Sequence, residues 1–386
     1  MDVQNSASEV ITDLLTVEMA LAPVKLQSGS LPVVVSTTTI AGTASVTPIQ
    51  FDRHRHMTVG DGDPQMPWRS LAGQQRSAIK WGQLKLWVTE IQFLTLYLDL
   101  VKHPHPIVVY VGAALGIHIA GLADMFPPVT FHLFDFHPKR KRVFHEVLED
   151  DAGKSRKANV QLFQRYFTDA DVATYAAMPS VYFITDIRSL SYDKSKKTEA
   201  DNRRNEKMAW DDMLLQQRWV LGIKPVRALL KLRFPYCYDF VQKEIGPTCP
   251  YLAGVVYLQP WTSPSSTETR LVPNDTYNTQ EWDYPAVEGM LFAHNTGIRE
   301  SGRFLNPLDL TPTPVAPELG FTMDWDSTFT VMVVMDYLRF VGALVTKPNV
   351  VSVLAVLVGR ANVGRTTLVG LRAGIRNLED DPNDDR

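Results

Sequence analysis

The sequence has few cysteines, no large surplus of either charge and no long uninterrupted apolar segment. Its 386 residues include only two cysteines, Cys237 and Cys249, which argues against a disulfide scaffold and suits a reducing compartment. The formal net charge is −3, so no overall field attracts nucleic acid, and any RNA binding would need a local basic groove. The N-terminus lacks a basic n-region and an apolar h-region, so no signal peptide is expected.

The most apolar region, residues 331–358, is interrupted by Asp336, Arg339, Lys347 and Pro348. These interruptions predict two buried helices, near 328–345 and 350–357, rather than a membrane span. The hydrophobic content of 45% is sufficient for one large core with embellishments. We expect a partly irregular N-terminal extension over 1–66, an α/β domain over 67–300, a helical part packed on it over 301–378, and an acidic disordered tail over 379–386.

One stretch organises the chain: a buried strand at Ile107–Val111, a glycine loop, a helix at Ile117–Met125, and a second strand at 129–134 that ends on Asp135. Gly112 lets the backbone turn sharply and approach a ligand closely. The small residues Ala113, Ala114 and Gly116 leave room above the strand end. Asp135 can accept hydrogen bonds from both hydroxyls of a ribose.

The glycine spacing in this loop is G-x-x-x-G, not the G-x-G-x-x-G of dinucleotide folds, and it offers no phosphate cradle. An adenosine-type ligand without a pyrophosphate therefore fits better, which points to S-adenosyl-L-methionine. The spacing disfavours an NAD-type oxidoreductase. The remaining alternative is a tight strand–helix turn with an acidic residue at a strand end.

Periodicity predicts the other elements. Helices are expected at 74–100, 139–148 and 208–221, a charged loop at 189–205, a hairpin or extended arm at 28–47, and strands at 160–163, 181–185, 226–232, 254–258 and 269–272. His54 and His56 lie in a predicted solvated loop, because a metal site would need further ligands nearby. Residues 359–366 nearly match a phosphate-binding loop, but Arg365 replaces the required lysine, so a helix C-terminus with basic caps is preferred.

Four ionisable residues stand at element ends or in apolar settings: Lys85, Asp186, Lys231 and Glu268. Methyl transfer to a ribose 2′-hydroxyl requires removal of its proton, and a free lysine is a poor base at neutral pH. Burial and a second cation lower a lysine's pKa. Two lysines with two carboxylates supply that arrangement, with Lys231 as the base, Lys85 as a positioning cation and the acids as orienting groups. The alternative is four unrelated surface charges.

The motifs GQLKL, VVYVGAALGIHIAGL, FITDIRS, RALLKLRFP and YLQPWTSPSSTETRLV occur in the order found in the poxvirus cap-specific mRNA (nucleoside-2′-O-)-methyltransferase family. These FtsJ-type enzymes carry a Lys-Asp-Lys-Glu tetrad, and the family also includes the regulatory subunit of the viral poly(A) polymerase. The resemblance covers roughly residues 81–291. It implies an α/β, Rossmann-like class I S-adenosylmethionine-dependent methyltransferase fold with N- and C-terminal embellishments, and 2′-O-methylation of a cap-proximal nucleotide of m7G-capped mRNA without a metal.

The resemblance carries over residue by residue. It implies that Lys85, Asp186, Lys231 and Glu268 are the tetrad, and that the cofactor contacts are Gly112, Ala113, Gly116, His118 and Asp135, with Phe163 and Arg165 at the adenine side. An aromatic sandwich would hold the positively charged N7-methylguanine by cation–π attraction. The implied cap-binding residues are Tyr236, Asp239 and Glu288, with Trp68 as the second aromatic; ordinary packing is the preferred interpretation of Trp68.

The chain also departs from this family. The N-terminal arm, the 189–205 segment and the C-terminus are longer than the family pattern, which puts the polymerase-partner role in doubt. Arginine is favoured over lysine, unlike in AT-rich poxviruses, so we expect a cellular relative, resembling the trypanosomatid enzymes, that acts in the nucleus, with residues 138–142 as a nuclear signal or RNA contact. A viral protein would act in host cytoplasm or virion. Expected partners are capped mRNA and a poly(A) polymerase or other capping enzymes. The rival function is a non-catalytic RNA-binding processivity subunit.

Overall fold

A computed structural model describes residues 47–69, 78–140, 142–189, 198–236 and 239–361 and Leu368, with the backbone alone at residues 239, 240 and 242. The arm at 28–46, the tail at 379–386 and most of the phosphate-loop-like segment at 362–366 lie outside the described residues. Within the described part, no helix combines the length and apolar character that a bilayer crossing demands.

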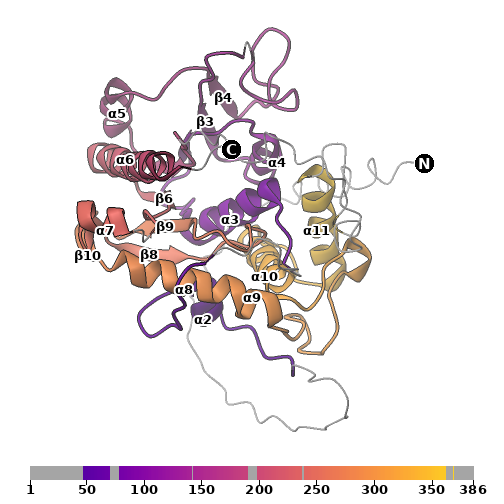
Figure 1. Ribbon diagram of the computed structural model, residues 1–386. Coiled ribbons are helices and arrows are strands. Elements are labelled where there is room, and N and C mark those ends of the chain that lie inside the picture. Colours follow the sequence, from indigo (N-terminus) through magenta and orange to yellow (C-terminus); the bar gives the residue numbers. More distant parts are fainter. Residues whose placement is uncertain are drawn as a thin grey trace.

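A mixed sheet of eight strands forms the centre of the molecule (Figure 1). Its order is β1 (Thr58–Val59), β8 (Gly254–Tyr257), β9 (Thr269–Pro273), β6 (Arg227–Leu232), β5 (Val181–Thr185), β2 (Ile107–Val111), β3 (Thr130–Phe134) and β4 (Val160–Phe163). The five strands from β6 to β4 are parallel, whereas β9, β8 and β1 are antiparallel to their neighbours. A separate antiparallel pair joins β10 (Thr279–Trp282) to β7 (Cys249–Leu252).

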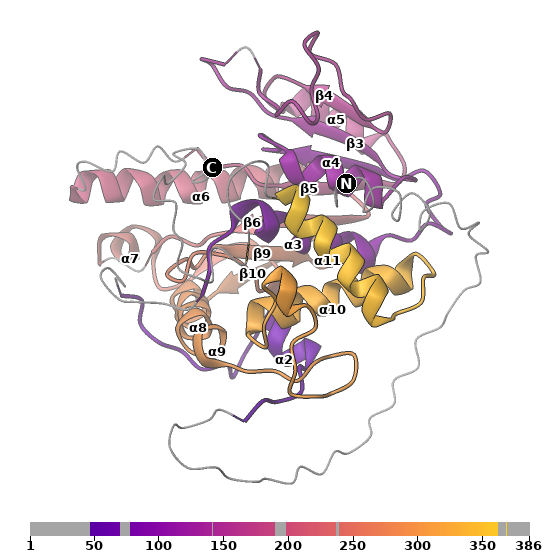
Figure 2. The ribbon, with the colours of Figure 1, turned by 90° about the vertical axis from the view of Figure 1, so that its right-hand side faces the viewer.

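Helices cover both faces of this sheet. The helices α5 (Asp169–Ala176) and α6 (Glu199–Ile223) pack together on one face, and α3 (Gly82–Tyr97) and α4 (Ile117–Met125) cover the other (Figure 1). The C-terminal helices α10 (Trp325–Phe340) and α11 (Lys347–Ala361) lie against α3 and α4 (Figure 2). Shorter elements complete the order: α2 (Arg53–Met57), α7 (Asp239–Ile245), α8 (Tyr284–Thr296), α9 (Ile298–Ser301) and the 3₁₀ helix η1 (Pro317–Leu319).

The inner parallel strands β2, β3 and β5 are mostly apolar because helices bury them from both sides. All five residues of β5 are buried, as are four of five in β2 and in β3. This mostly parallel sheet between helices confirms the predicted α/β, Rossmann-like fold. The strand order reverses between β2 and β5, and in such sheets ligands bind outside the carboxyl ends of the strands at that point. Gly112 follows β2 there, and Asp186 follows β5.

Three of the predicted helices differ from the structure. The helix predicted at 74–100 begins only at Gly82 and ends at Tyr97; residues 74–77 lie outside the described part, and the Trp81 N–H and the Ile79 carbonyl instead bond to Trp261 and Arg299. The segment predicted as a basic helix at 139–148 forms turns over its described residues. There the His145 N–H donates to the carbonyl of Leu115 in the glycine loop, so a tertiary contact replaces a helical one.

Helix α6 begins nine residues before the predicted position, at Glu199 rather than at residue 208. A capping box between Thr198 and Asp201 starts it, and this local signal was overlooked in a segment interpreted as a charged loop. The segment predicted as a solvated loop at 52–56 forms α2 instead. His54 is exposed, as expected, but His56 is only 4% exposed. His56 packs against Phe51 and Phe304, which gives it a place in the core.

Candidate active site

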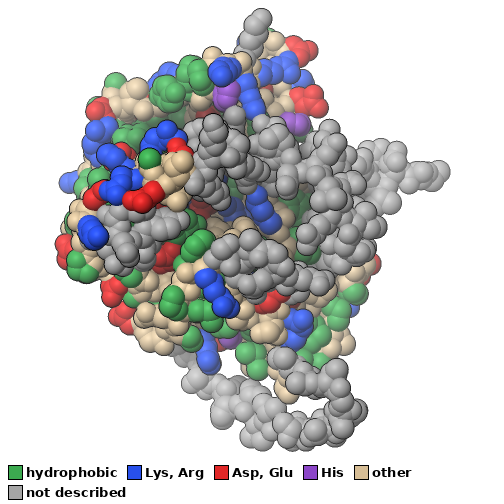
Figure 3. Space-filling view, in the orientation of Figure 1, with side chains coloured by type: hydrophobic (Ala, Val, Ile, Leu, Met, Phe, Trp, Pro, Cys, Tyr) green, Lys and Arg blue, Asp and Glu red, His purple; other side chains and the backbone are tan. Residues whose placement is uncertain are grey.

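The four ionisable residues singled out from the sequence lie together at the carboxyl edge of the parallel strands. Asp186 follows β5 and Lys231 lies near the end of β6. Since β9 is antiparallel to β6, it begins where β6 ends, and this places Glu268 beside Lys231. Lys85 reaches the same point from the first turn of α3. Figure 3 shows lysine and arginine side chains in a recess near the middle of the face that it displays.

The distances show one connected cluster. Lys231 Nζ lies 2.9 Å from Asp186 Oδ1 and 3.8 Å from Glu268 Oε2. Lys85 Nζ lies 2.9 Å from Glu268 Oε1, so Lys85 has a specific ion pair and is more than a snorkelling surface lysine. Lys231 Nζ also donates to the backbone carbonyls of Asp186 and Ile187 at 3.3 and 3.4 Å. The geometry excludes four unrelated surface charges.

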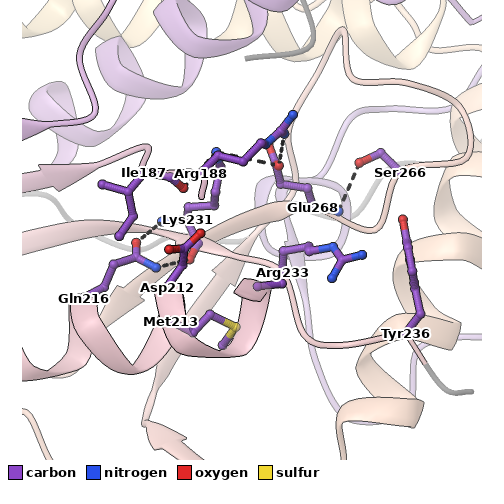
Figure 4. Close-up of a pocket in the computed structure, with 11 residues that line it drawn as sticks. Ile187, Arg188, Asp212, Met213, Gln216, Lys231, Arg233, Tyr236, Ser266 and Glu268 are labelled. Carbon is purple, nitrogen blue, oxygen red and sulfur yellow. Dashed lines mark hydrogen bonds and ion pairs between the residues drawn. The ribbon is translucent and has the colours of Figure 1, made fainter. Parts of the chain in front are cut away.

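Two arginines that the sequence analysis did not single out complete the cluster. Arg188 pairs with Glu268 at 2.6 Å, and Arg270 pairs with Asp186 at 2.7 Å (Arg188 and Glu268 in Figure 4). Arg270 also donates to the Thr185 carbonyl at 3.0 Å. Each arginine follows a predicted acid by two residues, at Asp186 and at Glu268, and that spacing was the signal in the sequence. Four cations therefore surround two carboxylates.

Burial and mutual charge shift the pKa values in this cluster. Burial lowers the pKa of Lys231, against the raising effect of Asp186 and Glu268. Burial alone would raise the pKa of Asp186, but Lys231 and Arg270 outweigh it and lower that pKa to about 2. Burial also opposes ionisation of Glu268, yet Lys231 and Lys85 hold its pKa well below its usual range. The site therefore combines two ionised carboxylates with an amine biased toward its neutral, basic form.

The glycine loop lies directly beside this cluster. Gly112 has φ +82°, and a Cβ there would lie 2.7 Å from the carbonyl carbon of Asp186 and from the Ile187 nitrogen. The sharp turn expected at Gly112 is confirmed, but the close approach that requires glycine is to the end of β5. A Cβ on Gly116 (φ +72°) would lie 2.6 Å from the Leu148 side chain. The loop and the Asp186 backbone are thus packed against each other.

Asp135 follows β3, as expected, and holds the loop. Its Oδ2 accepts from the Ala114 N–H at 2.8 Å and its Oδ1 from the Phe136 N–H at 2.7 Å. A carboxylate oxygen has a second lone pair, so these bonds leave it able to accept from ribose hydroxyls. Its own N–H donates to the Phe163 carbonyl at 3.2 Å, which places the end of β4 alongside.

The two residues expected at the adenine side form an aromatic and cationic corner. Phe163 stacks on Phe134 with 4.4 Å between ring centroids, and the Arg165 guanidinium lies over both rings. Arg165 is held by Asp171 through two hydrogen bonds of 2.7 and 2.6 Å. A carboxylate beside a flat, partly exposed stack could accommodate an adenosine group.

His118 is placed differently from the other expected cofactor residues. Its side chain is 2% exposed, and its ring nitrogens contact Gln83 at 3.0 Å and Glu90 at 3.1 Å. Glu90 in turn accepts from the Tyr110 hydroxyl at 2.7 Å. These contacts tie α4 to α3 and β2 beneath the loop. A direct bond from His118 to a cofactor would require one of them to break.

A cavity of about 80 Å³ opens beside the Lys231 side of the cluster. Figure 4 shows that its wall includes Lys231, Glu268 and Arg188, with Tyr236 and Ser266 at the opposite end. Helix α6 contributes Asp212 and Gln216 to the same wall. The cavity therefore leads from the candidate base toward the candidate cap-binding aromatics.

The structure brings Trp68 and Tyr236 into contact. Their ring centroids are 5.2 Å apart with an interplanar angle of 32°, and the Trp68 indole N–H donates to the Ser265 carbonyl. The Arg233 guanidinium lies over the Tyr236 ring at 4.2 Å and is held by Glu206. Glu288 is buried in α8, and the side chain of Asp239 lies outside the described part. A base between the two rings needs roughly 7 Å, because each contact takes about 3.5 Å, so Trp68 would have to move.

The chain was compared with known protein families. A family model described as "Poly A polymerase regulatory subunit" matches residues 70–284, which is more than half of the chain. The matched range contains the glycine loop, the six-charge cluster and Tyr236. No curated protein matches the chain significantly.

Proposed function

The chain belongs to the poly A polymerase regulatory subunit family, and from that premise we propose that it methylates the ribose 2′-hydroxyl of a cap-proximal nucleotide in m7G-capped mRNA, with S-adenosyl-L-methionine as the methyl donor. The observation that carries the proposal is Lys231, which is buried between two ionised carboxylates. It lines the cavity together with Ile187, whose backbone packs against Gly112 of the glycine loop.

Lys231 is the general base of the proposed reaction. Because burial favours its neutral form, its nitrogen can accept the proton of the 2′-hydroxyl as that oxygen becomes nucleophilic. Asp186 holds the amine at 2.9 Å and stabilises the ammonium that forms. Lys85 and Arg188 fix Glu268 from two sides, so the amine is aimed by a rigid frame.

The methyl donor would be held by the residues beside this frame. Asp135 accepts from the ribose hydroxyls, Gly112, Ala113 and Gly116 supply a low wall, and Phe163 and Arg165 lie at the adenine side. When bound, S-adenosyl-L-methionine supplies an electrophilic methyl group on a sulfonium. The fit rests on the carboxylate after β3 and on the absence of a phosphate cradle in the loop.

The cap would be recognised at the far end of the cavity. We propose that N7-methylguanine stacks on Tyr236 after Trp68 swings away, because a positively charged base is attracted to aromatic faces. Asp239 and Glu288 are the proposed acceptors for the guanine edge. Residues 65–68 run along α8, where the Met66 N–H donates to the Gly289 carbonyl. A shift of this segment would move Trp68 away from Tyr236.

A second function is favoured by the family description itself, which names a regulatory subunit of a poly(A) polymerase. The family places the chain in mRNA processing and points to a polymerase partner. In this second function the chain binds RNA and supports the polymerase without catalysis. We propose that the protein is cellular and acts in the nucleus, whichever of the two functions it has.

The test is methyl transfer from labelled S-adenosyl-L-methionine to m7G-capped RNA, comparing wild type with Lys231→Ala and with the exposed-lysine control Lys243→Ala. The product is digested to identify the labelled ribose. We expect label on a 2′-oxygen with wild type and Lys243→Ala only. If no variant transfers methyl while all bind capped RNA, the methyltransferase proposal is wrong and the regulatory function stands.

A further inference from the structure

Helix α6 holds the candidate base through a buried glutamine. Gln216 is 1% exposed. Its Oε1 accepts from the Lys231 backbone N–H at 3.1 Å, and its Nε2 donates to the Lys231 carbonyl at 3.2 Å (Figure 4). The Thr185 hydroxyl donates to the same Oε1. One amide group thus bridges the last residue of β5 and the strand residue that carries the base.

This bridge stands where two strands separate. The β5–β6 pairing runs from Tyr182 opposite Arg227 to Ile184 opposite Leu229, and Thr185 and Lys231 lie beyond it. A buried backbone N–H or C=O must find a partner or lose a hydrogen bond. The Gln216 amide has one donor side and one acceptor side, as a backbone peptide has, so it replaces the missing strand at Lys231.

The separation of the strands is what opens the cavity. Lys231 and Gln216 both line it, and the Lys231 amine crosses the gap to Asp186 at 2.9 Å. One turn earlier on α6, Asp212 accepts from the Ser189 N–H and hydroxyl at 2.8 and 2.6 Å. The same helix therefore holds both sides of the gap, one through Ser189 and one through Lys231.

We propose that Gln216 is a positioning residue for methyl transfer: its side-chain amide takes the place of strand pairing and fixes Lys231 opposite Asp186 across an opened crevice. This inference rests on the proposed function for its catalytic consequence, but not for its structural one. An apolar residue of similar length at position 216 lets the Lys231 backbone shift, and a misplacement of about 1 Å costs roughly 10²-fold in rate.

The experiment compares full-length wild type, Gln216→Met and the matched control Gln217→Met, which makes the same change at the next helical position. Methyl transfer gives kcat and the KM for S-adenosyl-L-methionine, and thermal unfolding shows whether each variant folds. Competitive acetylation at a series of pH values, read by mass spectrometry at Lys231, gives the titration midpoint of its amine. This last readout needs no turnover.

We expect Gln216→Met to lower kcat by roughly 10²-fold with an unchanged KM for S-adenosyl-L-methionine, since the Gln216 side chain bonds to Thr185 and Lys231 and not to the glycine loop. The charged groups that face Lys231, namely Asp186, Glu268, Arg188 and Arg270, stay in place. A midpoint that moves up toward that of a free lysine therefore reports water entering beside the amine. Gln217→Met should match wild type in every readout.

Wild-type kcat and an unchanged Lys231 midpoint in folded Gln216→Met would overturn the inference, as would a lower kcat with an unchanged midpoint, which indicates a structural role only. If Gln216→Met does not fold, Gln216→Asn decides by the same criteria, because it keeps an uncharged amide but is one methylene too short to bond both backbone groups of Lys231. If wild type transfers no methyl, the proposed function fails, and the midpoint alone judges Gln216.

Discussion

Lys231→Met should abolish methyl transfer without lowering stability. Methionine keeps much of the length of the side chain and removes its charge. Neither carboxylate is left without a cation, because Asp186 keeps Arg270 at 2.7 Å and Glu268 keeps Lys85 at 2.9 Å. The cluster goes from four cations around two carboxylates to three.

The expected magnitudes follow from this arrangement. Burial lowers the pKa of Lys231 in spite of two neighbouring carboxylates. Keeping the amine charged in the folded protein therefore costs folding free energy at neutral pH. That cost disappears as pH rises from the pKa of Lys231 in the folded protein to its pKa in the unfolded chain. Replacing such a charge with an apolar group is often neutral or stabilising, here by about 0–2 kcal/mol. Loss of a general base lowers the rate by roughly 10²–10⁴-fold.

The assay pairs urea unfolding, followed by tryptophan fluorescence, with methyl transfer to capped RNA. The control is Lys243→Met. Lys243 is exposed on α7, so this substitution removes the same charge from the surface. The control should leave both quantities unchanged. If Lys231→Met lowers the free energy of unfolding by about 3 kcal/mol or more, Lys231 serves as a structural counter-ion. If the variant keeps wild-type transfer, it is not the base.

Three further outcomes are expected. Asp186→Asn should lower the free energy of unfolding by about 3–5 kcal/mol. Because the pKa of Asp186 is lowered to about 2 from 3.8, wild type should lose roughly 2 kcal/mol as pH falls from 4 to 2. Urea unfolding that shows the same pH dependence in both proteins would contradict this. Gly112→Ala should abolish cofactor binding, measured by calorimetry, and should lower Tm more than Gly342→Ala does. Gly342 has a similar φ of +72° but open space where a Cβ would lie. An equal drop in Tm for the two variants would show that φ alone matters. Tyr236→Leu should weaken binding of m7G-capped RNA by about 0.5–2 kcal/mol in fluorescence titration and leave uncapped RNA unaffected; equal weakening of both would exclude cap stacking.

Much of the sheet was readable from the sequence because its signals are local. A strand buried on both faces is a short apolar run bounded by turn residues, and β2, β3 and β5 were found in this way. The loop at Gly112 and the acid at Asp135 could be predicted because each sits at the end of such a run. Helix α6 also has a local signal, the capping box at Thr198, but that signal was overlooked.

Other features depended on contacts between distant parts of the chain. In the segment 142–148, which is not helical, the His145 N–H bonds to the Leu115 carbonyl of the glycine loop, and no propensity in the segment indicates that contact. Gly112 is required by the backbone of Asp186, which lies more than seventy positions later. Such competition is decided by packing, which a sequence pattern does not contain.

The sequence by itself determined which residues could form the site: the ends of buried strands, and charges placed where burial is costly. Only the tertiary structure decided how they act together. The reversed direction of β9 sets Glu268 and Arg270 beside Lys231, and the separation of β5 from β6 gives Gln216 its two backbone partners. Strand direction and separation are properties of pairs of segments, so neither is encoded within any single stretch of residues.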